Sequence, residues 1–217
     1  MQLSLLRTKL VNSNNIFKMA HGGENIMVIL SSPSGVGKTT LTKKIQQKYP
    51  NFKISVSHTT RPPRSNEVNG IDYHFVSHKK FKELINENKF YEYAKIFENY
   101  YGTLKKNVDD DIIGNDIIFD IDWQGTKQLS KFKNLALIKI YLITDNKEEL
   151  KKRLIKRNQN SKKEVEERFN SFNDDIKHWN DYDYIIINKN LEVCLKQIEN
   201  IILNNKTKIF NSFHTIQ

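Results

Sequence analysis

The fold is decided by the stretch Ser32-Pro33-Ser34-Gly35-Val36-Gly37-Lys38-Thr39. An aliphatic run before it, Ile26–Leu30, is typical of a buried parallel strand. A helix is predicted after it, from Lys38 to Tyr49, and Pro50 stops that helix. The stretch matches the phosphate-binding template G-x-x-x-x-G-K-S/T except at its first glycine, where Ser32 stands. A strand, a glycine-containing turn and a helix in this order predict a phosphate-binding loop.

The residue types in this loop suit a nucleoside triphosphate. Gly35 and Gly37 let backbone N–H groups turn toward phosphate oxygens, and the start of the helix adds a positive partial charge. We expect Lys38 to reach the β- and γ-phosphates and the Thr39 hydroxyl to ligate Mg²⁺. The expected ATP-binding residues are Ser32, Pro33, Ser34, Gly35, Val36, Gly37, Lys38, Thr39 and Thr40.

Beyond the loop, short apolar runs alternate with helical segments, which is typical of an α/β fold with a mostly parallel sheet flanked by helices. Further strands are expected at Lys53–Val56, Asp116–Ile121, Leu135–Ile143 and Tyr184–Ile187. Further helices are expected at Gln124–Phe132, at Lys147–Lys156, from Ser161 onward and at Leu191–Leu203. Ser161 and Glu164 form a predicted capping box at the start of the third of these helices.

After Ser57, a segment with a different pattern of polar and apolar residues interrupts this alternation of strands and helices. Short alternating runs at Tyr73–Val76, Phe90–Phe97 and Tyr100–Leu104 predict antiparallel strands, with a helix at Lys79–Asn88 among them. We therefore expect a small subdomain inserted into the parallel sheet.

Composition excludes several classes of protein. A single cysteine, Cys194, excludes a disulfide scaffold and a Cys-rich zinc site and favours a reducing compartment. No apolar run is long enough for a transmembrane helix. The net charge of +10 is consistent with a solvated Lys-rich surface, or with an anionic partner such as a nucleic acid or a phosphorylated small molecule, and charge alone does not choose between them.

The segment Thr59–Arg64 offers a second site for phosphate. It places Arg61 and Arg64 three residues apart on a chain stiffened by two prolines. Two guanidinium groups held in this way suit one phosphate group, although two exposed loop arginines would give the same pattern.

With its surroundings, this segment resembles the guanylate kinase family of P-loop nucleoside monophosphate kinases. The family stretch T-T-R-x-P-R-x-G-E-x-(N/D)-G-x-D-Y-x-F is matched from Thr59 to Phe75, with Asn66 in place of a glycine. Three further family motifs follow in order, Phe90–Ala94, Asn99–Thr103 and Asp120–Gly125. The resemblance runs from about Ile26 to Leu203 and so covers most of the chain.

The resemblance implies two groups of acceptor-binding residues. The phosphate of GMP would be held by Arg61, Arg64, Tyr73 and Tyr101, and guanine by Ser57, Glu92, Thr103 and Asp122. The chemistry is consistent with this, because a carboxylate at Glu92 can accept from both N1–H and the exocyclic amine of guanine but would face a lone pair on adenine. Without the family pattern, Glu92 would be interpreted as a surface carboxylate on a strand.

The resemblance also implies a helical lid and a metal site. Arg153, Arg157 and Arg168 would close over the transferred phosphoryl group, with Asn158 replacing a common family glycine. Lys38 and Arg61 complete the expected catalytic set. Asp120 follows an apolar strand and is the candidate partner of Thr39 at the metal or its waters.

These features predict one guanylate kinase-like domain at 25–204. Its core would comprise about 25–56, 113–150 and 170–204, its GMP-binding subdomain about 57–112 and its lid about 151–169. Residues 1–24 are expected to be a disordered extension, with an organellar transit peptide or a translation start at Met19 as alternatives, and residues 205–217 a frayed tail.

The function expected from the resemblance is transfer of the γ-phosphoryl group of ATP to GMP with Mg²⁺, giving ADP and GDP. The alternatives are a catalytically inactive interaction module of the same fold and a related kinase that acts on a phosphorylated sugar. The expected partners are ATP and GMP, without nucleic acid or membrane, in a cytoplasmic monomer or homodimer.

Overall fold

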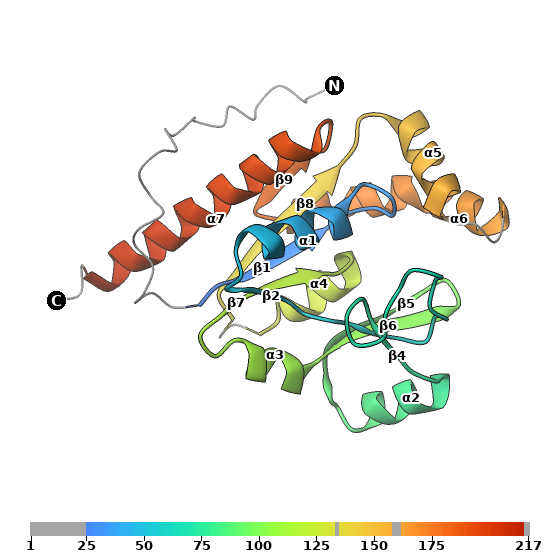
Figure 1. The fold of residues 1–217 in the computed structure, drawn as a ribbon, viewed down its shortest axis with the longest axis horizontal. Helices are drawn as coiled ribbons and strands as arrows, with labels where there is room; N and C mark the ends of the chain where they lie inside the picture. Colours follow the sequence, from blue (N-terminus) through green and yellow to red (C-terminus); the bar gives the residue numbers. More distant parts are fainter. Residues whose placement is uncertain (1–24, 133–134, 158–161, 215–217) are drawn as a thin grey trace.

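A five-stranded parallel sheet forms the centre of the protein (Figure 1). The computed structural model describes residues 25–132, 135–157 and 162–214. The strand order is β2-β7-β1-β8-β9. The bounds are β1 Met27–Ser31, β2 Phe52–Ile54, β7 Asp116–Asp120, β8 Leu137–Ile143 and β9 Tyr184–Ile187. This confirms the predicted α/β class and places the strand before the phosphate-binding loop at the centre of the sheet.

Both faces of the sheet are buried, as the continuous apolar run of β1 requires. Val28 and Leu30 point into a core shared with the long helices, whereas Met27 and Ile29 point into a second core on the opposite face. The first core is completed by α1 (Lys38–Lys48), α5 (Lys147–Arg157), α6 (Lys162–Ile176) and α7 (Leu191–His214). The second is completed by α3 (Lys105–Asp111) and α4 (Trp123–Leu129).

The inserted segment forms its own four-stranded sheet in the order β4-β3-β6-β5. The bounds are β3 His58–Thr59, β4 His74–Phe75, β5 Phe90–Ile96 and β6 Asn99–Leu104, with α2 at His78–Asn86. The helix packs on the sheet through Phe81, whose ring stacks on Phe90 with 4.6 Å between centroids. This sheet lies beside the main one in Figure 1.

The expectation of an all-antiparallel subdomain was wrong for one pair of strands. β5, β6 and β3 pair in antiparallel fashion, but β3 and β4 are parallel. The long connection between β3 and β4 carries the Arg61–Arg64 segment, and its length lets the chain return to start a parallel strand. β3, α3 and the 3-10 helix η1 (Lys177–Asp181) were not predicted, because each is short and has little apolar periodicity.

The last helix is longer than predicted. It continues past Leu203 to His214, so most of the expected tail at 205–217 is helical. Lys206 explains part of this extension, because its ammonium group pairs with the buried carboxylate of Asp116 and lies over the ring of Phe52. The predicted capping box at Ser161 and the extension at 1–24 lie outside the described residues.

Candidate active site

The phosphate-binding loop leaves the central strand and enters α1 through two glycines in left-handed conformations. Gly35 has φ of 87° and Gly37, the N-cap of α1, has φ of 111°. A side chain at Gly37 would also meet Asn188 Nδ2 at 2.8 Å. Ser32 stands where the template has glycine, and its hydroxyl donates to the carbonyl of Pro33 at 2.8 Å. The substitution therefore leaves the turn intact and adds one local hydrogen bond.

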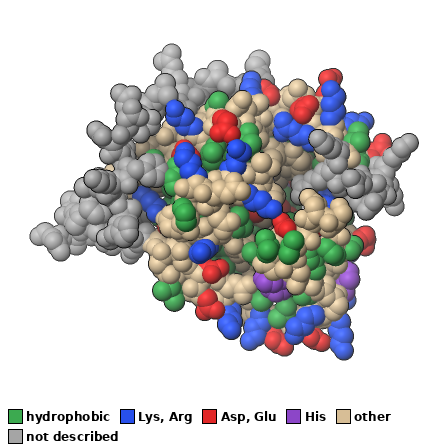
Figure 2. Space-filling model, viewed as in Figure 1, with side chains coloured by type: hydrophobic (Ala, Val, Ile, Leu, Met, Phe, Trp, Pro, Cys, Tyr) green, Lys and Arg blue, Asp and Glu red, His purple; other side chains and the backbone are tan. Residues whose placement is uncertain are grey.

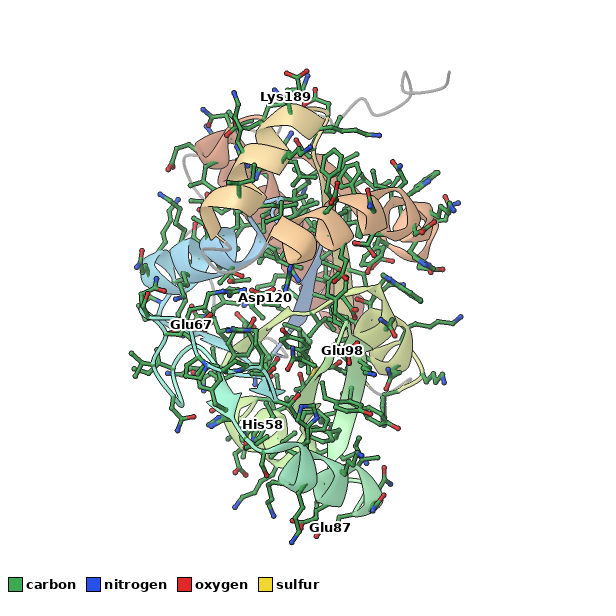
Figure 3. The ribbon with its side chains drawn as sticks, turned by 90° about the vertical axis from the view of Figure 1, so that its right-hand side faces the viewer. His58, Glu67, Glu87, Glu98, Asp120 and Lys189 are labelled. Atoms are coloured by element: carbon green, nitrogen blue, oxygen red, sulfur yellow. The ribbon has the colours of Figure 1, made fainter. Side chains whose placement is uncertain are left out.

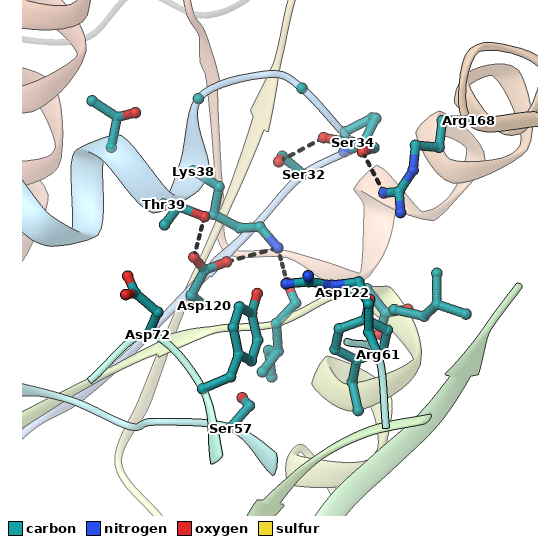
Figure 4. A pocket seen from close by; sticks show the side chains of 18 of the residues that line it. Ser32, Ser34, Lys38, Thr39, Ser57, Arg61, Asp72, Asp120, Asp122 and Arg168 are labelled. Carbon is teal, nitrogen blue, oxygen red and sulfur yellow. Dashed lines mark hydrogen bonds and ion pairs between the residues drawn. The ribbon is translucent and has the colours of Figure 1, made fainter. Parts of the chain in front are cut away.

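Three polar groups meet where α1 faces the end of β7 (Figure 4). Lys38 Nζ lies 2.9 Å from Asp120 Oδ1 and 3.0 Å from the carbonyl of Ile121. The Thr39 hydroxyl donates to Asp120 Oδ2 at 2.7 Å. The carboxyl end of a parallel strand beside the central loop is where α/β proteins place their ligands. Asp120 thus holds both loop residues to which the sequence assigned a role.

The loop opens into one large cleft between the main sheet and the inserted subdomain. Its volume is about 1350 Å³, which exceeds the usual 300–1000 Å³ of a site for one drug-sized ligand. Figure 3 shows Asp120 and Glu67 at the level of this cleft, with Lys189 toward one end of the molecule and His58 toward the other. A cleft of this size has room for two nucleotides.

An arginine pair lines the subdomain side of the cleft. Arg61 donates from Nη2 to both oxygens of Glu67 at 2.9 Å, and Arg64 Nη1 reaches the same carboxylate at 3.0 Å. The Arg61 guanidinium also lies over the ring of Tyr73, whose edge meets Tyr101. Glu67 therefore brings together the two arginines and orders the segment between β3 and β4.

The charge of Glu67 is itself fixed by these contacts. Burial acts to raise the pKa of Glu67, but the backbone N–H of Arg64 and the guanidinium of Arg61 hold it below its ordinary value. The carboxylate therefore stays ionised near neutral pH and keeps both guanidinium groups in place.

Glu92 is the most deeply buried acid in the cleft lining. It lies on β5, is 3% exposed, and pairs across the strands with Thr103 on β6. Burial raises its pKa to about 7, and the charge of Asp122 acts in the same direction. The Thr103 hydroxyl is fully buried and faces the Glu92 carboxylate, where it acts to lower the pKa of that group against the effect of burial. Such groups are costly to bury unless a ligand satisfies them.

Gly125 on α4 makes this position of Glu92 available. A side chain at Gly125 would place its Cβ 2.5 Å from Glu92 Oε2, so only glycine allows the helix and the carboxylate to lie so close. The Gly125 N–H donates to Asp122 Oδ1 at 3.0 Å, which makes Asp122 the N-cap of α4. One short helix thus positions both carboxylates.

Helices α5 and α6, which cover the predicted lid, contribute arginines to the cleft lining. Arg168 on α6 donates from Nη1 to the Ser34 hydroxyl at 3.1 Å, so it reaches the phosphate-binding loop. Arg153 on α5 lines the cleft and pairs through Nε with Glu149 at 3.2 Å. Arg157 is the last residue of α5, and its side chain is not among those that the structure describes.

The structure brings nearly all of the predicted residues to one cleft. Two exceptions concern buried side chains: Val36 is in the core and Thr103 is buried opposite Glu92 on the neighbouring strand, and neither lines the cleft. The predicted residues that line it are Ser32, Pro33, Ser34, Gly35, Gly37, Lys38, Thr39, Thr40, Ser57, Arg61, Arg64, Tyr73, Glu92, Tyr101, Asp120, Asp122, Arg153 and Arg168.

Several residues that line the cleft were missed. Asn188 donates from Nδ2 to the Val36 carbonyl at 2.7 Å, and its place after β9, at a strand's carboxyl end, was an available signal. Asp175 on α6 is a half-buried acid whose pKa is raised to about 6 by burial and by Asp122. No motif marked Asp175 or Phe97, because only the tertiary fold brings α6 and the β5–β6 turn to the cleft.

This arrangement, in which one cleft joins a phosphate-binding loop to several arginines and a buried carboxylate, is that of a P-loop phosphotransferase. The guanylate kinase family model matches residues 24–205. A guanylate kinase of Paramagnetospirillum magneticum is 40% identical over 184 residues, which cover 84% of this chain and 86% of that protein. One of Rickettsia prowazekii is 41% identical over 193 residues, which cover 88% of this chain and 98% of that protein.

A solved structure gives the same result. The crystal structure of guanylate kinase from Anaplasma phagocytophilum matches with a TM-score of 0.71 at 30% identity, covering 85% of this chain and 87% of that one. The chain therefore belongs to the guanylate kinase family, and it is a nucleoside monophosphate kinase. The family resemblance inferred from the motifs is confirmed. None of the helices in the described part of the chain has the length and apolar character needed to cross a bilayer.

Proposed function

We propose that the protein transfers the γ-phosphoryl group of ATP to GMP, giving ADP and GDP. The observation that carries this proposal is the one cleft that joins the phosphate-binding loop to the buried carboxylate of Glu92, which pairs across the strands with Thr103. Arg61 and Arg168 lie between these two ends. The two ends suit a triphosphate and a guanine base respectively, so the reacting phosphates would meet beside the arginines.

At the donor end, the loop N–H groups and Lys38 would hold the β- and γ-phosphates. The Thr39 hydroxyl and the Asp120 carboxylate are hard oxygen donors 2.7 Å apart, and such donors fit Mg²⁺. An ion held by these two oxygens would take its remaining ligands from substrate phosphates and water. When bound, Mg²⁺ would neutralise charge on the phosphate oxygens.

At the acceptor end, Glu92 and Asp122 would read the base. Glu92 would accept from N1–H and the exocyclic amine of guanine, and Thr103 would donate to O6. Ser57, which is buried immediately before β3, completes the proposed base-binding set. Arg61, Arg64, Tyr73 and Tyr101 would hold the GMP phosphate, with Glu67 keeping the two arginines oriented.

Transfer between the two ends needs positioning and positive charge. A GMP phosphate oxygen is already anionic, so no general base is required. Lys38 and Arg61, with Arg153, Arg157 and Arg168 from the lid, would stabilise charge on the equatorial oxygens of the transferred group and help to exclude water.

The net positive charge does not call for a further anionic partner. On the face shown in Figure 2, Lys and Arg side chains lie among acidic ones. Several lysines of α1 are paired, for example Lys44 with Glu192 and Lys48 with Glu199. We therefore keep ATP and GMP as the proposed partners, without nucleic acid, in a monomer or homodimer. We keep the cytoplasm as part of the proposal for the location of the protein.

A coupled assay of ADP release tests the proposal. ATP, Mg²⁺ and the full chain are combined with GMP, AMP, UMP or CMP in parallel. We expect strong turnover with GMP alone. Turnover with another nucleotide would support a kinase activity but reject the role of Glu92 in binding guanine. Tight binding of GMP without release of ADP would favour an inactive binding module.

A further inference from the structure

The turn between β5 and β6 carries an aromatic residue where the backbone favours glycine. β5 ends at Ile96 and pairs with Asn99, so Phe97 and Glu98 form a two-residue loop. Phe97 has φ of 53°, and Asn88 is the other non-glycine residue with positive φ among the described residues. Asparagine tolerates this conformation, but a bulky side chain rarely adopts it. Backbone geometry therefore does not explain the phenylalanine.

The ring of Phe97 has a specific neighbour instead. The Arg168 guanidinium lies over it, with its Cζ 5.2 Å from the ring centroid, which is within the range of a cation–π interaction. The same guanidinium donates to the Ser34 hydroxyl of the phosphate-binding loop. Figure 1 shows the β5–β6 hairpin and α6 on the same side of the molecule. Arg168 thus bridges the loop and the inserted subdomain.

We infer that Phe97 is a positioning residue that holds Arg168 over the phosphate-binding loop when the subdomain and α6 approach each other. This inference rests on the proposed function, because it assigns Arg168 to the transferred phosphoryl group. The ring face restricts the guanidinium from one side and the Ser34 hydroxyl from another. Since Phe97 lies on the subdomain that would carry GMP, it links the acceptor side of the cleft to a lid arginine.

A matched set of variants separates the ring from the backbone turn. Phe97→Asn removes the ring but keeps a residue that accepts positive φ, and Phe97→Gly is a second ring-less variant with the same tolerance. Phe97→Tyr keeps the ring. Glu98→Gln changes the neighbouring residue, which is exposed and lies outside the cleft lining.

Steady-state kinetics with ATP and GMP give the main readout. We expect Phe97→Asn and Phe97→Gly to lower kcat about tenfold, with KM for both substrates within about twofold of the wild type. Phe97→Tyr and Glu98→Gln should keep kcat within about twofold. In an Arg168→Met background, Phe97→Asn should lower kcat by less than about twofold, because the cation that Phe97 would position is absent.

Two results would overturn the inference. One is an equal loss of kcat in Phe97→Tyr and Phe97→Asn, which would mean that the turn rather than the ring matters. The other is a full additional loss of kcat when Phe97→Asn is combined with Arg168→Met, which would mean that the two residues act independently.

A measurement without turnover distinguishes this inference from the proposed function. The Nε–H resonance of Arg168, assigned by its disappearance in Arg168→Lys, should shift in Phe97→Asn and stay in Glu98→Gln, since the ring current is lost only in the first. A wild type that turns over no nucleotide would reject the proposed function. An unshifted Arg168 resonance would reject the contact, whatever the activity.

Discussion

Replacing Gly125 with alanine tests how closely α4 packs against the carboxylate of Glu92, the proposed guanine-binding group. The new Cβ would lie 2.5 Å from Glu92 Oε2, whereas ordinary contact begins at 3.4 Å, so the carboxylate must retreat by about 0.9 Å. A displacement of about 1 Å in a positioned group costs on the order of 100-fold in rate, or about 2.7 kcal/mol. We therefore expect kcat/KM for GMP to fall by about 10- to 100-fold, while KM for ATP stays unchanged.

The Gly125→Ala protein should still fold, because the substitution has one stabilising and one destabilising effect on the free energy of unfolding. Alanine in place of glycine within a helix is worth about 1 kcal/mol in helix propensity, which offsets part of the cost of moving a buried side chain. The free energy of unfolding, measured in urea, should therefore change by only about 1 kcal/mol. Lys127→Ala, an exposed substitution in the same helix, is the matched control.

The assay compares GMP with IMP, which lacks the exocyclic amine that Glu92 would bind. The preference for GMP over IMP should narrow in Gly125→Ala and persist in Lys127→Ala. An unchanged kcat/KM for GMP in a folded Gly125→Ala protein would refute the placement of guanine beside Glu92. An equal decrease in kcat/KM for ATP and for GMP would instead indicate general distortion of the cleft.

Four further predictions follow from charged groups. Because burial raises the pKa of Glu92 to about 7, KM for GMP should fall as pH rises from 6 to 8, and Glu92→Gln should leave only the dependence due to the substrate phosphate. The same raised pKa should make the ligand-free protein less stable as pH rises, because the folded state favours the protonated form of Glu92. The Glu92 contribution to the free energy of unfolding, measured in urea, should therefore fall between pH 4.5 and about 7. A rise of this free energy in the wild type relative to Glu92→Gln over the same pH range would contradict the prediction. Asp120→Asn should raise the Mg²⁺ concentration for half-maximal rate about tenfold, and an unchanged magnesium titration would exclude Asp120 from the metal site. Lys206→Met should lower the free energy of unfolding by about 1.5–3 kcal/mol, since it removes a charged partner of buried Asp116, whereas the exposed control Lys196→Met should be neutral.

Local pattern determined the strand, the loop and the helix around Lys38. These elements depend on interactions over only a few residues, so the local sequence is enough to predict them. The signals are the apolar run of β1, the glycines of the loop and Pro50 at the end of the helix. The same holds for the strand before Asp120 and for β9, which the structure places at the predicted Tyr184–Ile187. The motifs also predicted the guanylate kinase family, and the comparisons confirm this prediction. The roles of the individual site residues remain predictions that the variants above address.

Other features depended on residues that are far apart in the chain. The parallel pairing of β3 with β4, the continuation of α7 beyond Leu203 and the contact of Phe97 with Arg168 left no periodic signal. Each arises from a long-range partner: a long returning loop, a buried carboxylate at Asp116, or a guanidinium on another helix. The burial that raises the pKa of Glu92 belongs to the same class, because it is α4 that closes over the strand. The sequence alone thus determined which chemical groups this protein carries, and only the tertiary structure decided which of them meet, because contacts between distant segments depend on how whole elements pack.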